Sequence, residues 1–265
     1  MEEIYRNKGL SYYRNVREDI ISLLPKNNSQ KILEIGCGGG NTLVEIKERK
    51  LAQEVVGCDL FELENSFQKS PKIDRLIIAN LESDNLFLED NYFDVIIAGD
   101  VLEHLVDPWK VISDISKFLK NGGLFIVSLP NFREINTLSK IVLKGRFQYN
   151  PMGGIMDKTH LRFFCKKNII ELCDVREFKL INIKPLSQNS MNEVLSFSVK
   201  QRLLIAGVQL QNVVEKSVSS CDVTGIGSIF CLTQENGHFP LNLRLRLSPA
   251  RVWMKPYRPD EDCSG

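Results

Sequence analysis

A run of glycines follows a short apolar segment, and an acidic residue lies near the end of that segment. Residues 32–40 read ILEIGCGGG, which predicts a buried strand, a tight turn and then a helix. Glycine lets the backbone approach a ligand closely, because it carries no Cβ. The spacing G-x-G-G-G departs from the dinucleotide pattern G-x-G-x-x-G, and the Lys-Ser/Thr pair of a phosphate-binding loop is missing. Glu34 would repel a pyrophosphate, so we expect a ligand that carries an ammonium group.

A second acidic residue, Asp59, ends the next apolar segment, VVGCD. An acid at the end of the second strand can accept hydrogen bonds from both hydroxyls of a ribose. Glu34, Asp59 and the glycine turn would therefore bracket a nucleoside with an amino-acid-like tail, which describes S-adenosylmethionine. An NAD-dependent oxidoreductase is the rival interpretation, and both Glu34 and the glycine spacing disfavour it.

Two histidines are candidates for a general base, because imidazole titrates near neutral pH. His160 lies in GIMDKTHLRFF, residues 154–164, between Asp157 and Arg162, and we expect it to take a proton from an acceptor. The alternative is that His160 only holds backbone in place. His104 follows the fourth predicted strand, where ligands bind in parallel sheets, and is either a second base or a residue that packs beside the ligand. Asp157 either orients His160, binds a substrate hydroxyl or caps a turn.

Side chains of residues 131–165 are candidates for contact with an acceptor. Three of them are cationic: Arg133, Lys158 and Arg162. They suit a phosphorylated or carboxylated molecule such as a nucleotide-linked sugar, or else they are solvated or paired with acids. Aromatic residues at this density are more often part of a core. We assign Phe163 and Phe164 to the core and keep Tyr12 and Tyr149 as possible pocket residues.

Composition and charge limit the classes of partner. The three histidines lie far apart in sequence without metal-ligand spacing, which predicts no metal site. Seven scattered cysteines without a C-x-x-C pair are typical of a reduced, cytoplasmic protein. The net charge of +1 argues against nucleic acid or an anionic membrane held by bulk charge, although it allows a local patch. No apolar run reaches the roughly 18 residues of a membrane span, and the first residues do not resemble a secretory signal.

Short apolar runs alternate with helical patterns in the first half of the chain. The expected strands are Lys31–Ile35, Glu54–Cys58, Arg75–Ala79, Phe93–Ala98 and Leu124–Ser128. Helices are expected at 42–49 and 108–119, and strand-then-helix repeats predict a parallel sheet covered on both faces. Asn121–Gly123 would end the second of these helices. Ahead of the first strand, an amphipathic helix is expected from Val16 to Leu24, ending at Pro25.

The pattern loosens in the second half. Glycine and proline within residues 131–165 predict an insertion with short helices. The elements expected after it are a helix near Asn168–Val175, a strand near Phe178–Ile183, a partly helical stretch at Val199–Val214, a last strand near Ser228–Thr233 and an alternating, strand-like stretch at Leu241–Leu247.

Five motifs, in this order, resemble those of class I S-adenosylmethionine-dependent methyltransferases over most of residues 10–185. They are ILEIGCGGG at 32–40, Asp59 as the ribose acid, IANLE at 78–82, NYFDVI at 91–96 leading to GDVLEH at 99–104, and LKNGG at 119–123. The segment 154–164 and the Tyr12-Tyr13 pair followed by Arg17 resemble bacterial small-molecule methyltransferases, many of them similar to enzymes of surface-polysaccharide or natural-product biosynthesis.

The resemblance implies a Rossmann-like α/β fold. Its mostly parallel seven-stranded sheet would have an antiparallel last strand, helices on both faces, an N-terminal cap helix and an acceptor-binding insertion at about 130–165. The methyltransferase domain would span 1–236, and 237–265 would be a C-terminal extension of unknown role. The residues expected to bind the cofactor are Glu34, Gly36, Cys37, Gly38, Asp59, Leu60, Asn80, Leu81, Asp100, Val101 and His104. Asn80 and the Leu81 backbone would contact adenine, and Asp100 to His104 would line the sulfonium end.

The resemblance also implies transfer of a methyl group from S-adenosyl-L-methionine to a hydroxyl of a sugar, a nucleotide-linked sugar or a related small molecule, with S-adenosyl-L-homocysteine as product. The residues expected to contact the acceptor are Tyr12, Tyr13, Asn131, Arg133, Tyr149, Lys158 and Arg162. The alternatives are N- or C-methylation of a natural product or quinone-like ring, and a non-enzymatic protein that only holds the cofactor. We expect a cytoplasmic enzyme without a nucleic-acid partner or membrane span, and a homodimer is left open as one oligomeric state.

Overall fold

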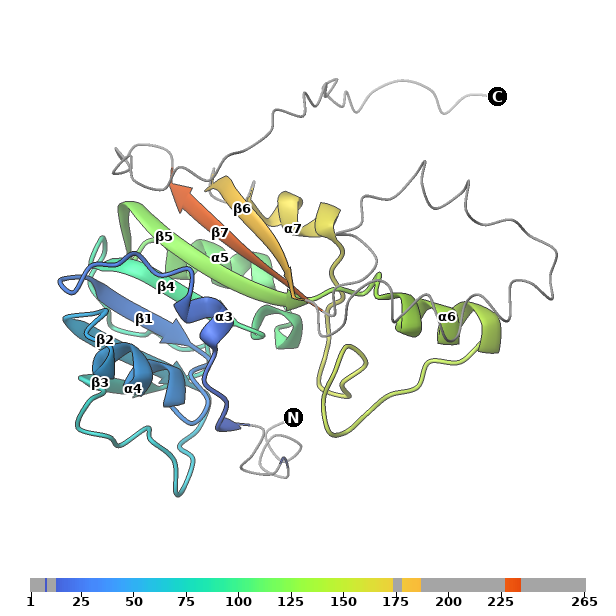
Figure 1. The fold of residues 1–265 in the computed structure, drawn as a ribbon, viewed down its shortest axis with the longest axis horizontal. Helices are drawn as coiled ribbons and strands as arrows, with labels where there is room; N and C mark the ends of the chain where they lie inside the picture. Colours follow the sequence, from blue (N-terminus) through green and yellow to red (C-terminus); the bar gives the residue numbers. More distant parts are fainter. Residues whose placement is uncertain (1–7, 9–12, 174–177, 187–226, 235–265) are drawn as a thin grey trace.

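The computed structural model describes residues 8, 13–173, 178–186 and 227–234. Within these residues, seven strands form one sheet in the order β3-β2-β1-β4-β5-β7-β6 (Figure 1). Their bounds are β1 Lys31–Ile35, β2 Glu54–Asp59, β3 Arg75–Ile78, β4 Phe93–Gly99, β5 Leu119–Pro130, β6 Phe178–Leu186 and β7 Gly227–Gln234. The five strands β1 to β5 pair in parallel, and β7 lies antiparallel between β5 and β6. The expectation of a Rossmann-like α/β fold with a mostly parallel sheet is confirmed.

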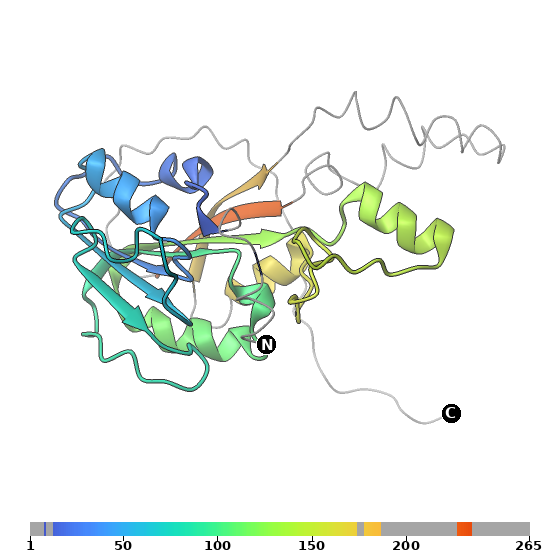
Figure 2. The same ribbon diagram turned by 90° about the horizontal axis from the view of Figure 1, so that it is seen from below.

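Helices cover both faces of this sheet, as Figure 2 shows. They are α3 (Glu18–Ile21) and α4 (Asn41–Glu48) on one face, and α5 (Pro108–Ser116) and α7 (Lys166–Cys173) on the other. Along β4, Val95 and Ile97 pack in the core with α3 and α4, whereas Ile96 and Ala98 pack in the core with α5 and α7. This alternation follows from the period of two in a strand, and burial on both faces explains why the strands are almost continuously apolar.

The fifth strand begins earlier than the sequence pattern predicted. The expectation that Asn121–Gly123 ends a helix is wrong, because α5 ends at Ser116 and these three residues lie inside β5. The register between β4 and β5 shifts between Phe93 and Val95. Gly122 has a φ of +76°, a conformation that glycine adopts with little strain. The glycines therefore form an irregular start to the strand and not a helix stop.

The helix expected ahead of the first strand is shorter than its apolar pattern. Only Glu18–Ile21 is helical, although Ile20 and Leu24 are buried as the pattern requires. After α3 the chain continues in tight turns, in which the Leu24 amide donates to the Ile21 carbonyl at 3.1 Å. The apolar spacing thus predicted which side chains are buried better than it predicted the length of the helix.

The insertion between β5 and α7 contains one described helix, α6 (Ile135–Lys144). The carboxylate of Glu134 accepts hydrogen bonds from the amides of Asn136 and Thr137 at 2.8 and 2.7 Å, which caps the start of α6. Gly145, with a φ of +59°, ends it. In Figure 1, α6 extends away from the sheet. The described part of this segment thus contains one short helix where the sequence predicted several, and its role in binding an acceptor stays a prediction.

Several expectations lie outside the described residues: the helical stretch at Val199–Val214, the strand-like stretch at Leu241–Leu247, the C-terminal extension at 237–265 and the contact of Tyr12 with an acceptor. Among the helices that the structure does describe, none combines the length and the apolar character that crossing a bilayer requires.

Candidate functional site

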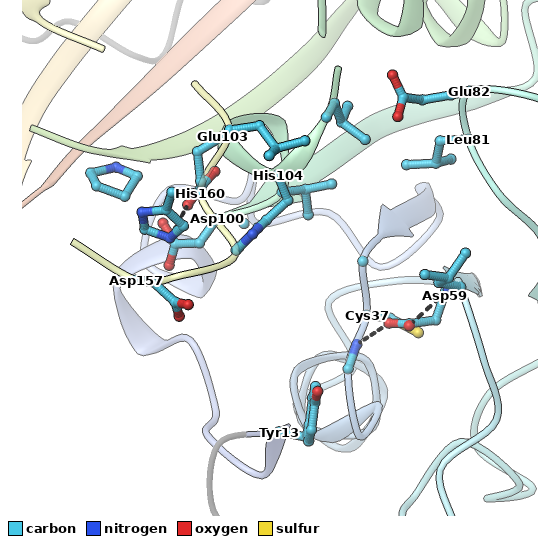
Figure 3. Close-up of a pocket in the computed structure, with 18 of the residues that line it drawn as sticks. Tyr13, Cys37, Asp59, Leu81, Glu82, Asp100, Glu103, His104, Asp157 and His160 are labelled. Atoms are coloured by element: carbon cyan, nitrogen blue, oxygen red, sulfur yellow. Dashed lines mark hydrogen bonds and ion pairs between the residues drawn. The ribbon is translucent and has the colours of Figure 1, made fainter. Parts of the chain in front are cut away.

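The strand order reverses beside β1, whose neighbours are β2 and β4. At such a point the loops after adjacent strands leave in opposite directions and open a crevice at the carboxyl edge of the sheet. A cavity of about 950 Å³ lies here, lined by residues 36–38 after β1, 59–61 after β2 and 99–101 after β4. Part of the insertion, including Asp157 and His160, forms its opposite wall (Figure 3). The cavity thus joins the two groups of residues that the sequence singled out.

The glycine turn is shaped for a close approach of backbone and ligand. Gly36 has a φ of +65°, and a Cβ added there would lie 2.3 Å from Cγ2 of Val101. A Cβ on Gly39 would lie 2.7 Å from the carbonyl oxygen of Tyr13, which accepts a hydrogen bond from the Gly39 amide at 3.0 Å. Larger residues at these two positions would therefore displace either the loop after β4 or the segment that carries Tyr13.

The Asp59 carboxylate accepts hydrogen bonds from backbone amides in the glycine turn and in the loop after β2. One carboxylate oxygen accepts from the Gly38 amide at 2.7 Å and the other from the Leu60 amide at 2.8 Å. Burial raises the pKa of Asp59 to about 6, and the backbone donors oppose this shift. The Phe61 amide is a third backbone donor to this carboxylate, which has about four lone-pair sites in all, so Asp59 can still accept a hydrogen bond from a ligand hydroxyl.

Glu34 is buried beneath the glycine turn and does not line the cavity. Its Oε2 atom has no hydrogen-bond partner among the described residues. Burial raises the pKa of Glu34 to about 8, and Arg17 opposes this shift by its charge. A buried carboxylate oxygen without a partner is costly, and a ligand ammonium group is one chemistry that would satisfy it.

Asn80 and Leu81, expected on the adenine side, line the cavity beside Glu82. The side-chain carbonyl of Asn80 accepts from the Glu82 amide at 2.9 Å, and the carboxylate of Glu82 accepts from the Asp107 amide at 2.8 Å. These hydrogen bonds hold the turn after β3 against the start of α5, so this wall of the cavity is preformed.

Asp100 directly follows β4, lines the cavity and has a φ of +55°. Its carboxylate accepts from the Arg17 guanidinium at 2.7 Å and from the Ser128 hydroxyl at 2.6 Å. Arg17 in turn forms an ion pair with Asp19 at 2.8 Å. Sequence patterns alone gave Arg17 no role at the site, because its partners Asp100 and Ser128 are more than 80 residues away in sequence.

The two candidate bases meet on the side of the cavity opposite the glycine turn. The ring centroids of His104 and His160 are 4.7 Å apart, although 55 residues separate the two in sequence. Nδ1 of His104 lies 3.1 Å from the carbonyl oxygen of Thr159, and Nδ1 of His160 lies 3.0 Å from that of Ile155. A carbonyl only accepts, so each Nδ1 carries the proton and each neutral ring keeps its Nε2 lone pair.

Burial lowers the pKa of both imidazoles. For His104 the pKa falls to about 4, through burial first and the neighbouring His160 second. The pKa of His160 is also lowered by burial, and the Ile155 carbonyl opposes that shift. Both rings are therefore neutral at pH 7, the state in which an imidazole can accept a proton.

Glu103 lies directly beside this pair and is fully buried. Its Oε1 is 3.9 Å from Nε2 of His160, and neither carboxylate oxygen has a hydrogen-bond partner among the described residues. Burial raises the pKa of Glu103 well above its usual range. Its backbone carbonyl accepts from the amides of Leu161 and Arg162 at 2.8 and 2.9 Å, which fixes the insertion to the short helix η1 (Leu102–His104).

Glu103, His104 and His160 also form a donor set that could hold a metal ion. One ligand atom from each lies within 4.8 Å of the others, which is close enough for a shared ion. The sequence did not predict this cluster, because His160 is distant in sequence from Glu103 and His104 and only the fold brings the three together. The expectation of no metal site stays a prediction, and metal analysis of the purified protein would test it.

Asp157 belongs to a buried polar cluster that faces the imidazoles. Its Oδ2 forms an ion pair with Nζ of Lys8 at 2.6 Å, and both side chains are at most 2% exposed. Its Oδ1 accepts from the amide and the hydroxyl of Thr159 at 2.9 and 2.8 Å. Of the three roles considered for Asp157, this geometry supports turn capping. Burial raises the pKa of Asp157, but the hydrogen bonds from Lys8 and Thr159 lower it by more. The pKa therefore lies below its usual value, and the carboxylate is ionised.

Most residues expected to contact the acceptor lie outside the cavity lining. Tyr13 lines it, and Tyr149 lines a smaller neighbouring pocket. The guanidinium of Arg162 instead donates to the carbonyl of Val106. The side chain of Asn131 lies in a buried turn, where its oxygen accepts a hydrogen bond from the backbone amide of Arg133 at 3.1 Å. Lys158 is exposed and does not line the cavity, and neither does Arg133.

The two phenylalanines assigned to the core differ. Phe164 is buried, as expected, but Phe163 is 40% exposed, so its assignment to the core is wrong. It packs on the partly buried ring of Phe132, with 4.8 Å between ring centroids. Adjacent residues in an extended segment point to opposite sides, which explains why only one of the pair faces the core.

Comparison with known proteins agrees with this geometry. Residues 9–183 match a family model described as a methyltransferase domain. A ubiquinone biosynthesis O-methyltransferase of Ruegeria sp. is 32% identical over 115 residues, which cover 38% of this chain and 41% of that relative. Another protein of that name, from Shewanella halifaxensis, is 22% identical over 188 residues, with 68% of this chain and 77% of that relative covered. The chain matches between 38% and 54% of the length of three curated relatives.

The crystal structure of an S-adenosylmethionine-dependent methyltransferase from Archaeoglobus fulgidus has the same fold. Its TM-score against this chain is 0.55 at 17% sequence identity, and the match covers 84% of this chain and 97% of that one. At this identity the likeness establishes the architecture alone.

Proposed function

We propose that this chain, which belongs to the methyltransferase domain family, transfers a methyl group from S-adenosylmethionine to a hydroxyl group of a small molecule. One observation carries the proposal. Two neutral imidazole rings lie together on one side of a cavity, and the glycine turn and Asp59 lie on the other (Figure 3).

The described residues fit S-adenosylmethionine, the cofactor of this family. The charge of the buried Glu34 suits the ammonium group of the methionine tail, with the glycine turn lying between them, because Glu34 does not itself line the cavity. A nearby ammonium group would also lower the raised pKa of Glu34 and keep it ionised. Asp59 suits the ribose hydroxyls, and Asn80 and Leu81 form the wall expected beside adenine.

When bound, the cofactor supplies an electrophilic methyl group whose leaving group departs uncharged, so the protein need not protonate it. The chain's own residues then have two tasks. They align the acceptor, which can contribute on the order of 7–11 kcal/mol in favourable cases. They also remove the proton of a hydroxyl, which contributes about 10²–10⁴-fold in rate.

We assign the proton transfer to His160. Its Nδ1 is committed to the Ile155 carbonyl, so Nε2 is the atom that receives the proton. His104, with a pKa of about 4, is a weak base at neutral pH and serves to support the His160 ring and line the cavity. Asp157 holds the turn that carries His160, whose amide donates to the Asp157 carbonyl at 3.1 Å.

The charges of the cavity favour an uncharged acceptor. Among its described lining residues, Arg17 is the only arginine or lysine, and it is paired with Asp19 and Asp100. A nucleotide-linked sugar therefore has less support than a neutral sugar or another hydroxylated small molecule. A phenolic, quinone-like ring is a second candidate, because two of the relatives named above are ubiquinone biosynthesis O-methyltransferases.

The test is to incubate the protein with labelled cofactor and a panel of neutral sugars, nucleotide-linked sugars, catechols and amines, and to measure S-adenosylhomocysteine. We expect transfer to hydroxylated acceptors and a fall of at least 100-fold in kcat for His160→Ala. Lys167→Ala, an exposed change at the start of α7, is the matched control and should retain full activity. Transfer to amines alone, with His160→Ala fully active, would refute the hydroxyl acceptor and the assigned base.

A further inference from the structure

The helix α6 lacks the buried side that a helix in a globular protein normally has. None of its ten residues is buried, and it extends away from the sheet in both ribbon views (Figures 1 and 2). Ile135, Leu138 and Ile141 are half-buried, and every residue from 142 to 152 is exposed. Most helical stability in proteins comes from packing of an apolar face. Since the described residues leave α6 without a buried side, we expect a partner beyond them to cover it.

The exposed side chains include an unusual number of large apolar residues. Five occur between residues 142 and 152: Val142 at 75% exposure, Leu143 at 67%, Phe147 at 54%, Tyr149 at 55% and Met152 at 69%. Single exposed apolar residues are normal, but five within eleven residues indicate an interaction surface. We call these five residues, with Lys140, Lys144 and Arg146, the α6 surface.

The charge of the α6 surface has one sign. Residues 135–156 contain no aspartate or glutamate, whereas Lys140, Lys144 and Arg146 are all cationic. The whole chain carries a net charge of only +1, so this positive charge is a local feature. A partner must therefore offer both an apolar layer and negative charge. The interface of an anionic lipid bilayer offers both, and helices with apolar and basic faces bind there.

The α6 surface also adjoins the active-site cavity. Thr137, on the first turn of α6, lines the main cavity and also a second pocket of about 540 Å³. Lys140, Arg146 and Tyr149 line that second pocket as well. A layer in contact with α6 would thus lie next to the acceptor side of the cavity.

We propose that the α6 surface docks this protein on an anionic lipid bilayer. The apolar side chains enter the boundary between headgroups and acyl chains, and the three cations contact the anionic headgroups. This proposal rests on the exposure and charge of α6 and is independent of the methyl acceptor.

The test is co-flotation of the full chain with vesicles of pure phosphatidylcholine and of phosphatidylcholine mixed with phosphatidylglycerol. We expect binding to the mixed vesicles that weakens as salt is added. Lys140→Gln/Lys144→Gln should weaken this binding roughly thirtyfold, because each cation near an anionic surface contributes about fivefold. Val142→Asp/Leu143→Asp should abolish it. Circular dichroism and cofactor binding establish that the variants remain folded.

Phe87→Asp and Lys69→Gln are matched controls, since Phe87 is 80% exposed and the Lys69 side chain 75% exposed, both outside the insertion. They should float like the parent protein. The proposal is overturned if the parent protein does not bind mixed vesicles, or if the α6 variants bind as well as the controls. It is equally overturned if Val142→Asp/Leu143→Asp only converts a dimer to a monomer without any vesicle binding, which would identify a second copy as the partner.

Discussion

Replacement of Lys8 by methionine should destabilise the protein far more than the loss of a typical lysine. The Lys8–Asp157 ion pair is 2.6 Å long and almost completely buried. Removal of one partner from a buried pair leaves an uncompensated charge, at a typical loss of 3–5 kcal/mol in the free energy of unfolding. Asp157 keeps two hydrogen bonds from Thr159, which places the expected loss for Lys8→Met near the lower bound, about 3 kcal/mol.

Urea unfolding followed by circular dichroism would measure this loss. With an m-value of about 3 kcal/mol/M for a chain of this size, the midpoint should fall by about 1 M. Asp157→Asn should lower the free energy of unfolding by a similar amount. The double variant Lys8→Met/Asp157→Asn should lose about 2 kcal/mol less than the two single variants lose together, because no buried charge is left unpaired. The control is Lys69→Met, whose ion pair with Glu62 is exposed and should contribute less than 1 kcal/mol.

The pH dependence gives an independent check on the same pair. The pKa of Asp157 in the folded protein lies below its usual value of 3.8. The ion pair therefore contributes stability above about pH 4, and this contribution is lost as the pH falls through the folded pKa. Additive single variants, or a Lys8→Met loss below 1 kcal/mol, would refute the interpretation of Lys8 and Asp157 as a buried, coupled pair.

Three other predictions follow from the site. The pKa of His104 falls from 6.5 to about 4 on folding, so the free energy of unfolding should decrease by about 3 kcal/mol as the pH falls from 6.5 to 4. Denaturation of His104→Gln across this pH range should not show this decrease. Gly36→Ala should lower cofactor affinity at least tenfold in calorimetry, since its Cβ would meet Val101 at 2.3 Å, whereas Gly145→Ala, where a Cβ meets nothing within 4 Å, should bind normally. Asp59→Asn should weaken S-adenosylmethionine binding by about 10–100-fold in the same assay, because a hydrogen bond to a charged group contributes about 1.5–3 kcal/mol, and unchanged affinity would exclude Asp59 as the ribose acid.

Local patterns predicted the elements around the glycine turn well. The strand at Lys31–Ile35, the glycine turn and Asp59 lie within one strand–turn–helix–strand unit, where spacing alone determines that the loops share an edge of the sheet. The start of β5 was missed because glycine is typical of a helix end, whereas here Asn121–Gly123 lie in the irregular stretch between the pairs Phe93–Leu119 and Val95–Leu124 of β4 and β5.

The acceptor side was predicted less well, because its contacts join distant parts of the chain. His104 and His160 were each identified from their motifs, but their contact depends on hydrogen bonds between the Glu103 carbonyl and the insertion. Lys8 carried no signal, because a single lysine in a polar segment is normally solvated. Arg162 was expected to meet a substrate, but its guanidinium satisfies a backbone carbonyl instead, a role that charge alone does not reveal.

The carbonyl of Glu103 accepts hydrogen bonds from two successive amides of the insertion, which join η1 and the segment at Leu161–Arg162 into one hydrogen-bonded unit. The same unit borders the loop after β4 on the cofactor side and carries the turn with His160 on the acceptor side. A ligand that fixes the position of η1 therefore also fixes the position of His160. We expect the two ligands to bind with positive cooperativity, each raising the affinity for the other by the same factor.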